Sequence, residues 1–226
     1  MISAIIVAGG KGTRMGADKN KILLPLMDKE IISRTVSAFE DCSLIDEIII
    51  VTAQCDIKEV QMIIARDGYN KISHITEGGT LRQNSVYNGL KLAKGDIVLI
   101  HDGARCLVTD AEICSVIADA KAFGAAAVGV KVKDTLKTID KNGDIIATVD
   151  RENTVHIQTP QCFKASEITR LHQKASDDGI EVTDDCSIFE YYGQKVHLTE
   201  GSYDNIKITT PEDMIVGENI LKGRIL

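Results

Sequence analysis

Short apolar runs alternate with amphipathic segments along most of the chain, and this order constrains the fold more than any other feature. Four runs rich in β-branched or small residues have the length of buried strands, and they cover 2–7, 48–51, 97–100 and 125–130. Between them, apolar residues recur at helical spacing in 31–40, 58–67, 83–93 and 110–123. Thr109, just before the last of these segments, is a typical helix N-cap. The pattern therefore predicts an α/β fold, with a mostly parallel sheet and helices on both faces.

Residues 131–150 break this order, because polar and apolar residues alternate on both sides of Asn142-Gly143. Asn-Gly between two alternating segments is a strong signal for a β-hairpin. We expect strands near 135–140 and 145–149 that protrude from the sheet as an arm. The composition leaves open whether the arm is a simple edge hairpin or reaches a second subunit. Since no linker-like segment divides the chain, we expect residues 1–226 to form a single domain.

The composition excludes several functional classes. A formal net charge of -7 and an aromatic content of 4% argue against a nucleic-acid binder. No stretch reaches the roughly 18 apolar residues of a membrane helix, and the N-terminus lacks a secretory signal. The six cysteines are scattered, without the spacing of zinc ligands. We therefore expect reduced thiols in a cytoplasmic protein that binds neither membrane nor nucleic acid.

The glycine-rich segment VAGGKGTRMG, residues 7–16, follows the first predicted strand. Met15 stands where a dinucleotide-binding turn needs its third small residue, and Thr13-Arg14 stand where a phosphate-binding loop of the Walker type needs Lys-Ser/Thr. Glycines still let backbone N–H groups approach phosphate oxygens, and Arg14 with Lys19 or Lys21 adds positive charge. The segment indicates a phosphate-binding loop, and the alternative is a surface turn with solvated basic residues.

Three further segments add to this interpretation. The sequence HDGAR follows a predicted strand and puts Asp102 at the carboxyl edge of the sheet, where it can hold hydroxyl groups or Mg²⁺, or simply cap a loop. The segment EGGTLRQNS, residues 77–85, is a second glycine turn whose backbone can admit a flat base. In DNIKIT, residues 204–209, we expect Lys207 to lie beside a strand. The prolines at 25, 160 and 211 are expected at element boundaries.

Taken in order, AGGKGTRMG, GGTLRQNSV, HDGAR, TVDR, TPQCF, TDD and DNIKIT resemble the 2-C-methyl-D-erythritol 4-phosphate cytidylyltransferases. The resemblance spans Ala8 to Thr209, and the order of the motifs is more specific than any one of them. It implies a Rossmann-like α/β fold, a homodimer formed through the arm and a requirement for Mg²⁺. The implied reaction joins CTP to 2-C-methyl-D-erythritol 4-phosphate and releases diphosphate, as in the non-mevalonate route to isoprenoids.

The resemblance also implies a role for each matching residue. Arg14 and Lys21 correspond to the pair that stabilises the charged transition state, and Arg151 and Lys207 grip the acceptor phosphate. The cytidine nucleotide would be bound by Ala8, Gly9, Gly10, Gly79, Ser85 and Asp102. The polyol hydroxyls would be held by Asp102, Arg105 and Thr159. Thr135 and Arg151 would reach the acceptor phosphate from the partner subunit. No protein ligand to the metal is assigned, apart from Asp102 as a candidate.

The chain departs from the family pattern at two positions. Cys106 stands where relatives usually carry proline after HDxAR, and Asn20 replaces the proline common before the catalytic lysine. If the register at Asn20 is shifted, Lys19 takes the place of Lys21.

Three alternatives stay open at this point. They are a ribitol 5-phosphate cytidylyltransferase, a CTP-binding protein without catalysis, and an NAD-dependent oxidoreductase. The last is weakened by Met15 and by the lack of an acidic residue at the end of the second strand. No catalytic base is needed for cytidylyl transfer, since a phosphate nucleophile is already anionic at neutral pH.

Overall fold

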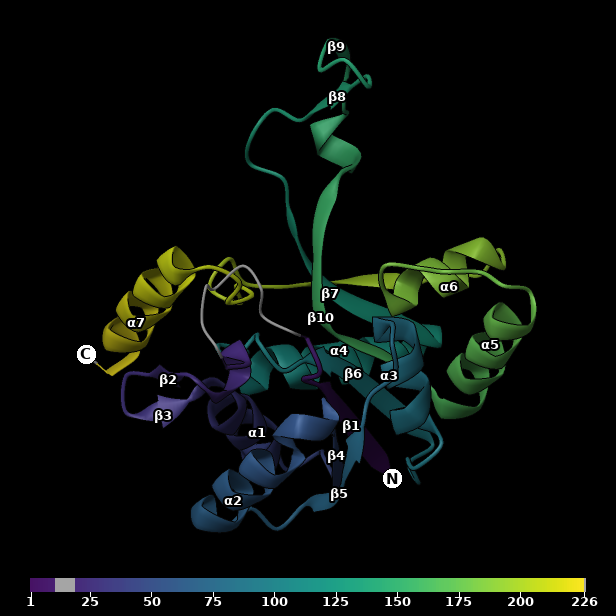
Figure 1. The fold of residues 1–226 in the computed structure, drawn as a ribbon. Helices are drawn as coiled ribbons and strands as arrows, with labels where there is room; N and C mark the ends of the chain where they lie inside the picture. Colours follow the sequence, from purple (N-terminus) through teal and green to yellow (C-terminus); the bar gives the residue numbers. More distant parts are fainter. Residues whose placement is uncertain (11–18, 226) are drawn as a thin grey trace.

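A seven-stranded sheet runs through the computed structural model, which describes residues 1–10 and 19–225 (Figure 1). Its strands are β1 (Ile2–Val7), β4 (Glu47–Thr52), β5 (Ile72–Glu77), β6 (Ile97–Asp102), β7 (Ala125–Lys131), β10 (Val155–Lys164) and β11 (His197–Glu200). They lie in the order β11-β7-β10-β6-β1-β4-β5. Only β10 pairs antiparallel with its neighbours β6 and β7, whereas the other pairs are parallel. The predicted mostly parallel sheet is confirmed.

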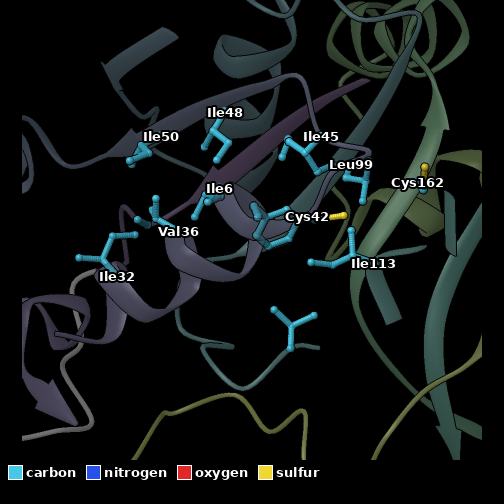
Figure 2. Packing of buried hydrophobic residues seen from close by; sticks show 14 of the residues in the cluster. Ile6, Ile32, Val36, Cys42, Ile45, Ile48, Ile50, Leu99, Ile113 and Cys162 are labelled. Carbon is cyan, nitrogen blue, oxygen red and sulfur yellow. The ribbon is translucent and has the colours of Figure 1, made fainter. Parts of the chain in front are cut away.

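Helices cover both faces of this sheet, as predicted. One layer contains α1 (Ile31–Asp41), α2 (Ile57–Asp67) and α4 (Asp110–Phe123), and the other contains α3 (Arg82–Leu90), α5 (Ala165–Asp177) and α6 (Asp185–Tyr191). Successive side chains of a strand enter opposite layers: Ile6 packs in the first core and Ile5 in the second, both fully buried. Figure 2 shows the first core, where Ile6, Val36 and Leu99 lie between α1 and the sheet.

Smaller elements surround the sheet. They are β2 (Pro25–Leu26), β3 (Lys29–Glu30), the short 3₁₀ turns η2 (Lys21–Leu23), η3 (Gln54–Asp56) and η4 (Arg151–Asn153), and the C-terminal helix α7 (Pro211–Ile225). The residues Met214, Ile220 and Leu221 of α7 pack on a third cluster around Leu26 and Ile208. Within the described ranges 1–10 and 19–225, no helix has the length and apolar character needed to cross a bilayer.

Helix α4 shows how local sequence determines an element boundary. The Thr109 hydroxyl accepts a hydrogen bond from the Glu112 N–H (3.3 Å), and the Glu112 carboxylate accepts one from the Thr109 N–H (2.9 Å). This reciprocal capping box starts the helix at Asp110, as the sequence predicts. The helix ends where Gly124 adopts a φ of 93°, a conformation that favours glycine.

The predicted hairpin arm (residues 131–150) is present and projects away from the sheet (Figure 1). Its strands are β8 (Lys137–Ile139) and β9 (Ile145–Thr148), which pair antiparallel and are shorter than expected. In the turn, the Asp140 carboxylate accepts hydrogen bonds from the N–H groups of Asn142 (2.8 Å) and Asp144 (2.9 Å), and Gly143 has a φ of 93°. The Asn-Gly signal therefore identified the turn correctly.

Two expectations about boundaries are wrong. Pro160 lies inside β10, where the pairing with β7 is interrupted between Ile157 and Gln161, so the missing N–H breaks no regular ladder. The segment 204–209 is not a strand. It crosses the carboxyl edge of the sheet, where the Ile208 N–H donates to the Ala104 carbonyl (2.9 Å) and the Asn205 amide donates to the Thr159 carbonyl (3.0 Å). These contacts hold it as a loop against the residues that follow β6.

Candidate active site

A cleft of about 890 Å³ opens at the carboxyl ends of β1, β4, β5 and β6. Loops from neighbouring parallel strands meet at this edge of an α/β sheet, so residues far apart in sequence come together there. Eight of the predicted site residues line it, namely Ala8, Gly9, Gly10, Lys21, Gly79, Ser85, Asp102 and Lys207. Arg14 lies outside the described residues.

The two candidate lysines of the first loop differ in their surroundings. Lys21 begins η2 and lines the cleft. Lys19 instead pairs with Glu59 of α2, its Nζ lying 3.2 Å from the carboxylate oxygen. Between them, the buried Asn20 donates to the Ala8 carbonyl (3.0 Å) and to Asp56 (2.8 Å), which ties Asn20 to the end of β1 and to η3. Of the two lysines, Lys21 is the one that lines the cleft.

The glycine turn after β5 packs directly on the first turn of α3. A Cβ added to Gly78 would lie 2.7 Å from the Ser85 Oγ, and one added to Gly79 would overlap the Asn84 side chain. The Gly79 N–H donates to the Ser85 Oγ (3.0 Å), which in turn donates to the Leu81 carbonyl (3.2 Å). Side chains at these two positions would displace Ser85 or Asn84, so the glycines let the turn pack on α3 and leave its backbone open to the cleft.

Asp102 and the three cations around it, Arg82, Arg105 and Lys207, form a charged group that we call the floor of the cleft. The Asp102 carboxylate lies 2.8 Å from the Lys207 Nζ, 3.3 Å from the Arg82 Nε and 3.8 Å from the Arg105 Nε. Burial alone would raise the pKa of Asp102, but the positive charges of Arg82, Lys207 and Arg105 and the hydrogen bond from Lys207 hold it below its usual value. Asp102 is therefore ionised at neutral pH and orients three cations.

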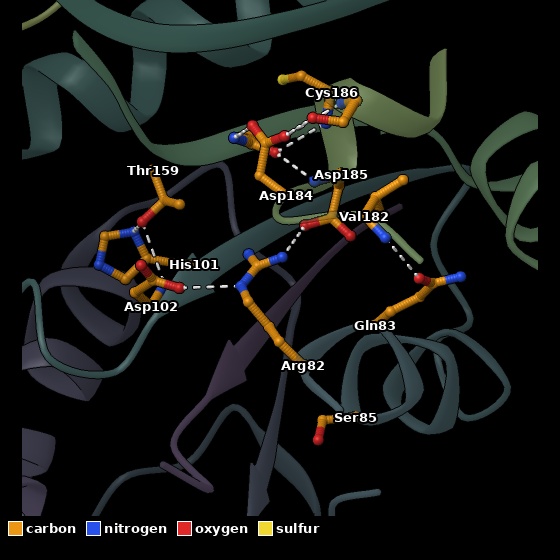
Figure 3. A network of polar contacts seen from close by, with 12 residues as sticks. Arg82, Gln83, Ser85, His101, Asp102, Thr159, Val182, Asp184, Asp185 and Cys186 are labelled. Carbon is orange, nitrogen blue, oxygen red and sulfur yellow. Dashed lines mark hydrogen bonds and ion pairs between the residues drawn. The ribbon is translucent and has the colours of Figure 1, made fainter. Parts of the chain in front are cut away.

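Behind this floor, Arg82 joins Asp102 to a second buried carboxylate (Figure 3). Its Nη1 lies 2.8 Å from an oxygen of Asp185, and the other Asp185 oxygen lies 3.0 Å from the His172 Nε2. The backbone N–H of Asp185 donates to the Gln161 side chain (3.1 Å). Sequence reasoning missed Arg82 and Asp185 as site residues. The only signal for Asp185 was its place in the TDD motif.

His101 and Thr159 support the backbone of Asp102. The Asp102 N–H donates to the Thr159 Oγ1 (3.0 Å), which lies 3.1 Å from the His101 Nδ1, as seen in Figure 3. The other ring nitrogen of His101 lies 3.1 Å from the Arg105 carbonyl. Burial lowers the pKa of His101 to about 4, so the ring is neutral at pH 7. Thr159 is itself buried, and its hydroxyl orients Asp102.

Arg105 lies below the cleft surface. Its Nη1 donates to the Asn205 carbonyl (2.7 Å), which ties the loop of Lys207 to the HDGAR segment. Burial lowers the pKa of Arg105, and the Asp102 carboxylate opposes that shift. The predicted polyol-binding residues Arg105 and Thr159 therefore contact Asp102, but neither of them lines the cleft.

The two predicted arm residues are not brought to this cleft. Thr135 within the arm and Arg151, which directly follows the arm in η4, are both exposed, and the Arg151 Nη1 donates to the Lys133 carbonyl (3.3 Å). Neither residue lines the cleft of its own chain, since the arm points away from the sheet (Figure 1).

Asp102 is poorly suited to hold Mg²⁺. Both of its oxygens already face cationic side chains, Arg82 on one side and Lys207 with Arg105 on the other. A divalent cation at the same carboxylate would meet the repulsion of three positive charges. Mg²⁺ is commonly bound largely through substrate phosphates, with only one or two protein carboxylates.

Comparison with known proteins identifies the family. The family model described as 2-C-methyl-D-erythritol 4-phosphate cytidylyltransferase matches residues 2–223. The chain is 49% identical over 222 residues to the protein of that name from Clostridium novyi, covering 97% of this chain and 96% of the relative. A relative of the same name from Desulforamulus reducens is 45% identical, covering 99% of this chain and 97% of the relative.

Solved structures agree with this match. A 4-diphosphocytidyl-2C-methyl-D-erythritol synthase from Anaerococcus prevotii superposes with a TM-score of 0.86 at 32% identity, covering 98% of this chain and 96% of that one. The resemblance stated from the motifs is therefore confirmed, and the chain belongs to the 2-C-methyl-D-erythritol 4-phosphate cytidylyltransferase family.

Proposed function

We propose that this chain transfers the cytidylyl group of CTP to 2-C-methyl-D-erythritol 4-phosphate. A phosphate oxygen of the acceptor bonds to the α-phosphorus of CTP, the bond from that phosphorus to the bridging oxygen of the β-phosphate breaks, and diphosphate leaves. Membership of the family and the name shared by the relatives support this activity. The structural observation that carries it is the cleft in which Lys21 and the Asp102-bound cations face a glycine-lined recess.

The main barrier to this reaction is the approach of two anionic phosphates. Fixed cations lower such a barrier because they need no reorganisation as charge develops on the leaving group. Arg14 and Lys21 are proposed to act at the α-phosphate, and Lys207 at the acceptor phosphate. The acceptor supplies an oxygen that is already ionised, so no general base is required. This agrees with His101 being buried and neutral beneath the site.

The recess formed by both glycine segments is proposed to bind the nucleotide. Its members are Ala8, Gly9, Gly10, Gly79 and Ser85, which line one continuous cleft. Asp102 is proposed to accept hydrogen bonds from acceptor hydroxyls. Arg105 and Thr159 would act through Asp102, because their side chains hold its carboxylate and its backbone.

The arm is proposed to complete the site of a second copy of the chain. Thr135 and Arg151 lie too far out to line their own cleft, and Ile139, Ile145 and Ile146 leave a strongly exposed apolar surface on the same arm. An isologous dimer would cover that surface and deliver Arg151 to the partner's acceptor phosphate.

We further propose that Mg²⁺ enters with the triphosphate and supplies additional charge neutralisation there. A cytoplasmic location is proposed because all six cysteines are free thiols, as is usual in a reducing compartment.

The activity is tested by diphosphate release. The purified chain should release diphosphate from CTP and Mg²⁺ when 2-C-methyl-D-erythritol 4-phosphate is present, and much less when ribitol 5-phosphate replaces it. The Lys21→Ala variant is the matched control for contaminating enzymes. Equal or faster turnover with ribitol 5-phosphate, or no turnover with either acceptor, would contradict the proposal.

A further inference from the structure

Three side chains with metal-binding atoms meet on the layer of α1 and α4, away from the cleft. Cys42 follows the last residue of α1, and Asp110 and Cys114 lie four residues apart in the first two turns of α4. The two Sγ atoms are 4.0 Å apart, and the Cys114 Sγ is 3.7 Å from the Asp110 Oδ1. One ligand atom from each residue lies within 4.8 Å of the other two. We propose that Cys42, Asp110 and Cys114 bind a thiophilic divalent cation of the Zn²⁺ class.

The spacing of the three donors suits a tetrahedral ion. Thiolates bound to Zn²⁺ at about 2.3 Å lie about 3.8 Å apart in tetrahedral geometry, and a carboxylate oxygen lies about 3.5 Å from each. The observed 4.0 Å and 3.7 Å are close to these values. A disulfide would instead need the sulfur atoms to close to about 2.05 Å, and it would give Asp110 no role. Two of the three separations are thus close to those of a tetrahedral site, and the ligand atoms of the third pair, Cys42 and Asp110, lie within 4.8 Å of each other.

The residues around the cluster hold Cys42 in place and leave the cluster open to solvent on one side. Cys42 is fully buried among apolar residues of the first core, including Ile45 and Ile113, which Figure 2 places beside it. The Lys71 Nζ donates to the Cys42 carbonyl (2.7 Å) and fixes the backbone at the end of α1. Asp110 is exposed and Cys114 is half-buried, so an ion can enter from solvent and keep a water as its fourth ligand.

The cluster would bind a cation through two thiolate sulfur atoms and one carboxylate oxygen. Metal-bound sulfur ligands are thiolates, so an ion bound by both sulfur atoms displaces their thiol protons. Soft thiolates also select against Mg²⁺, which keeps this site separate from the nucleotide chemistry.

Binding would link α1 to α4. The same α1 contacts the floor of the cleft, since the Thr35 hydroxyl donates to the Gly103 carbonyl (2.9 Å) beside Asp102. An ion that binds the folded chain more tightly than the unfolded chain raises the free energy of unfolding by mass action. Metal binding should therefore appear as an increase in thermal stability, independently of any activity.

The test uses the reduced, full-length protein with excess Mg²⁺ and no nucleotide, titrated with Co²⁺ as a spectroscopic substitute for Zn²⁺. We expect one Co²⁺ per chain, with a thiolate-to-metal charge-transfer band and tetrahedral d–d bands that Zn²⁺ abolishes. Cys114→Ser, at a half-buried position, should lose the charge-transfer intensity of one thiolate and weaken binding by about a hundredfold. Asp110→Asn should weaken binding while keeping that band.

Cys55→Ser is the matched control, because Cys55 is an exposed thiol outside the cluster. It should leave both the spectrum and the affinity unchanged. Zn²⁺ should raise the Tm of the wild type and of Cys55→Ser but not that of Cys114→Ser. Failure of the reduced wild type to bind Co²⁺, an unchanged spectrum in Cys114→Ser, or oxidation to a Cys42–Cys114 disulfide in a protein that binds no Co²⁺ would each overturn the proposal.

Discussion

The floor of the cleft and the arm contain similar charged side chains in opposite surroundings. In the floor, Asp102 is buried and faces Lys207 at 2.8 Å and Arg82 at 3.3 Å. In the arm, Arg151 is exposed, and its contact within the chain is a 3.3 Å hydrogen bond to the Lys133 carbonyl. The charges of the floor are therefore held in place by their own subunit before any substrate binds, whereas the charge of Arg151 is not.

This contrast indicates how the two regions would contribute to the proposed reaction. Buried charge pairs keep a fixed geometry, but breaking one leaves the other charge unpaired at a high cost in stability. Exposed cations usually add little to stability. Changes in the floor should therefore affect folding as well as activity, whereas changes in the arm should affect activity alone.

The largest effect is expected from Arg82→Met. This variant removes the shared partner of Asp102 and Asp185, both of which are buried, and should cost about 3–5 kcal/mol in the free energy of unfolding. Urea denaturation measures it. Arg66→Met is the surface control, since Arg66 pairs with Glu30 in an exposed position and should cost far less. Equal losses in the free energy of unfolding would show that the buried ion pairs of the floor stabilise the fold no more than exposed ones do.

The second-largest effect is expected from Lys21→Ala, which should lower the rate of catalysis. Loss of one fixed positive charge at the α-phosphate should lower kcat by about 10²–10³-fold, equivalent to about 3–4 kcal/mol. Steady-state assays of diphosphate release measure this. Lys19→Ala is the matched control, because its Nζ pairs with Glu59 outside the cleft. If Lys19→Ala shows the large loss and Lys21→Ala does not, the register assigned to this loop is wrong.

The pH dependence of stability should report the buried His101. Its pKa in the folded chain is about 4, below the value near 6.5 expected when unfolded, so the unfolded state binds more protons between these values. The stabilisation is therefore fully present above pH 6.5 and is lost as pH falls toward 4, by up to about 3 kcal/mol. Chemical denaturation across this range, compared with His101→Gln, measures the slope. An equally steep slope in the variant would assign the effect to other groups.

The smallest effect is expected from Arg151→Ala. It should lower kcat/KM for the acceptor by about 10–100-fold, or about 1–3 kcal/mol, while leaving the Tm almost unchanged because the side chain is exposed. Lys137→Ala, elsewhere on the arm, is the control for general damage to the hairpin. A large fall in Tm for Arg151→Ala would remove the distinction between arm and floor.

Local patterns in the sequence predicted the features that depend on neighbouring residues. Strand and helix periodicity gave the layers, Asn142-Gly143 gave the turn of the arm, and Thr109 gave the start of α4. Each of these is determined within a few residues, so a single sequence is enough.

Contacts between distant segments could not be predicted in the same way. Arg82 and Asp185 are 103 residues apart, and Cys42 and Cys114 are 72 apart, so only the packing of their elements brings them together. Pro160 was placed at a boundary because proline usually interrupts a strand, but the local shift in the pairing of β10 with β7 accommodates it. The segment of Lys207 reads as a strand in isolation, and its contacts with the loop after β6 hold it in another conformation.

The most direct test of the central claim is complementation between two variants that are each impaired in activity. Lys21→Ala lacks a cleft residue and Arg151→Ala lacks an arm residue, so each homodimer is impaired at both sites. After equal mixing and subunit exchange, half of the dimers should be mixed and carry one intact site, which restores about a quarter of wild-type activity. No recovery above the sum of the separate variants, with exchange verified by mass spectrometry of differently tagged subunits, would place Arg151 at its own subunit's site and contradict the account.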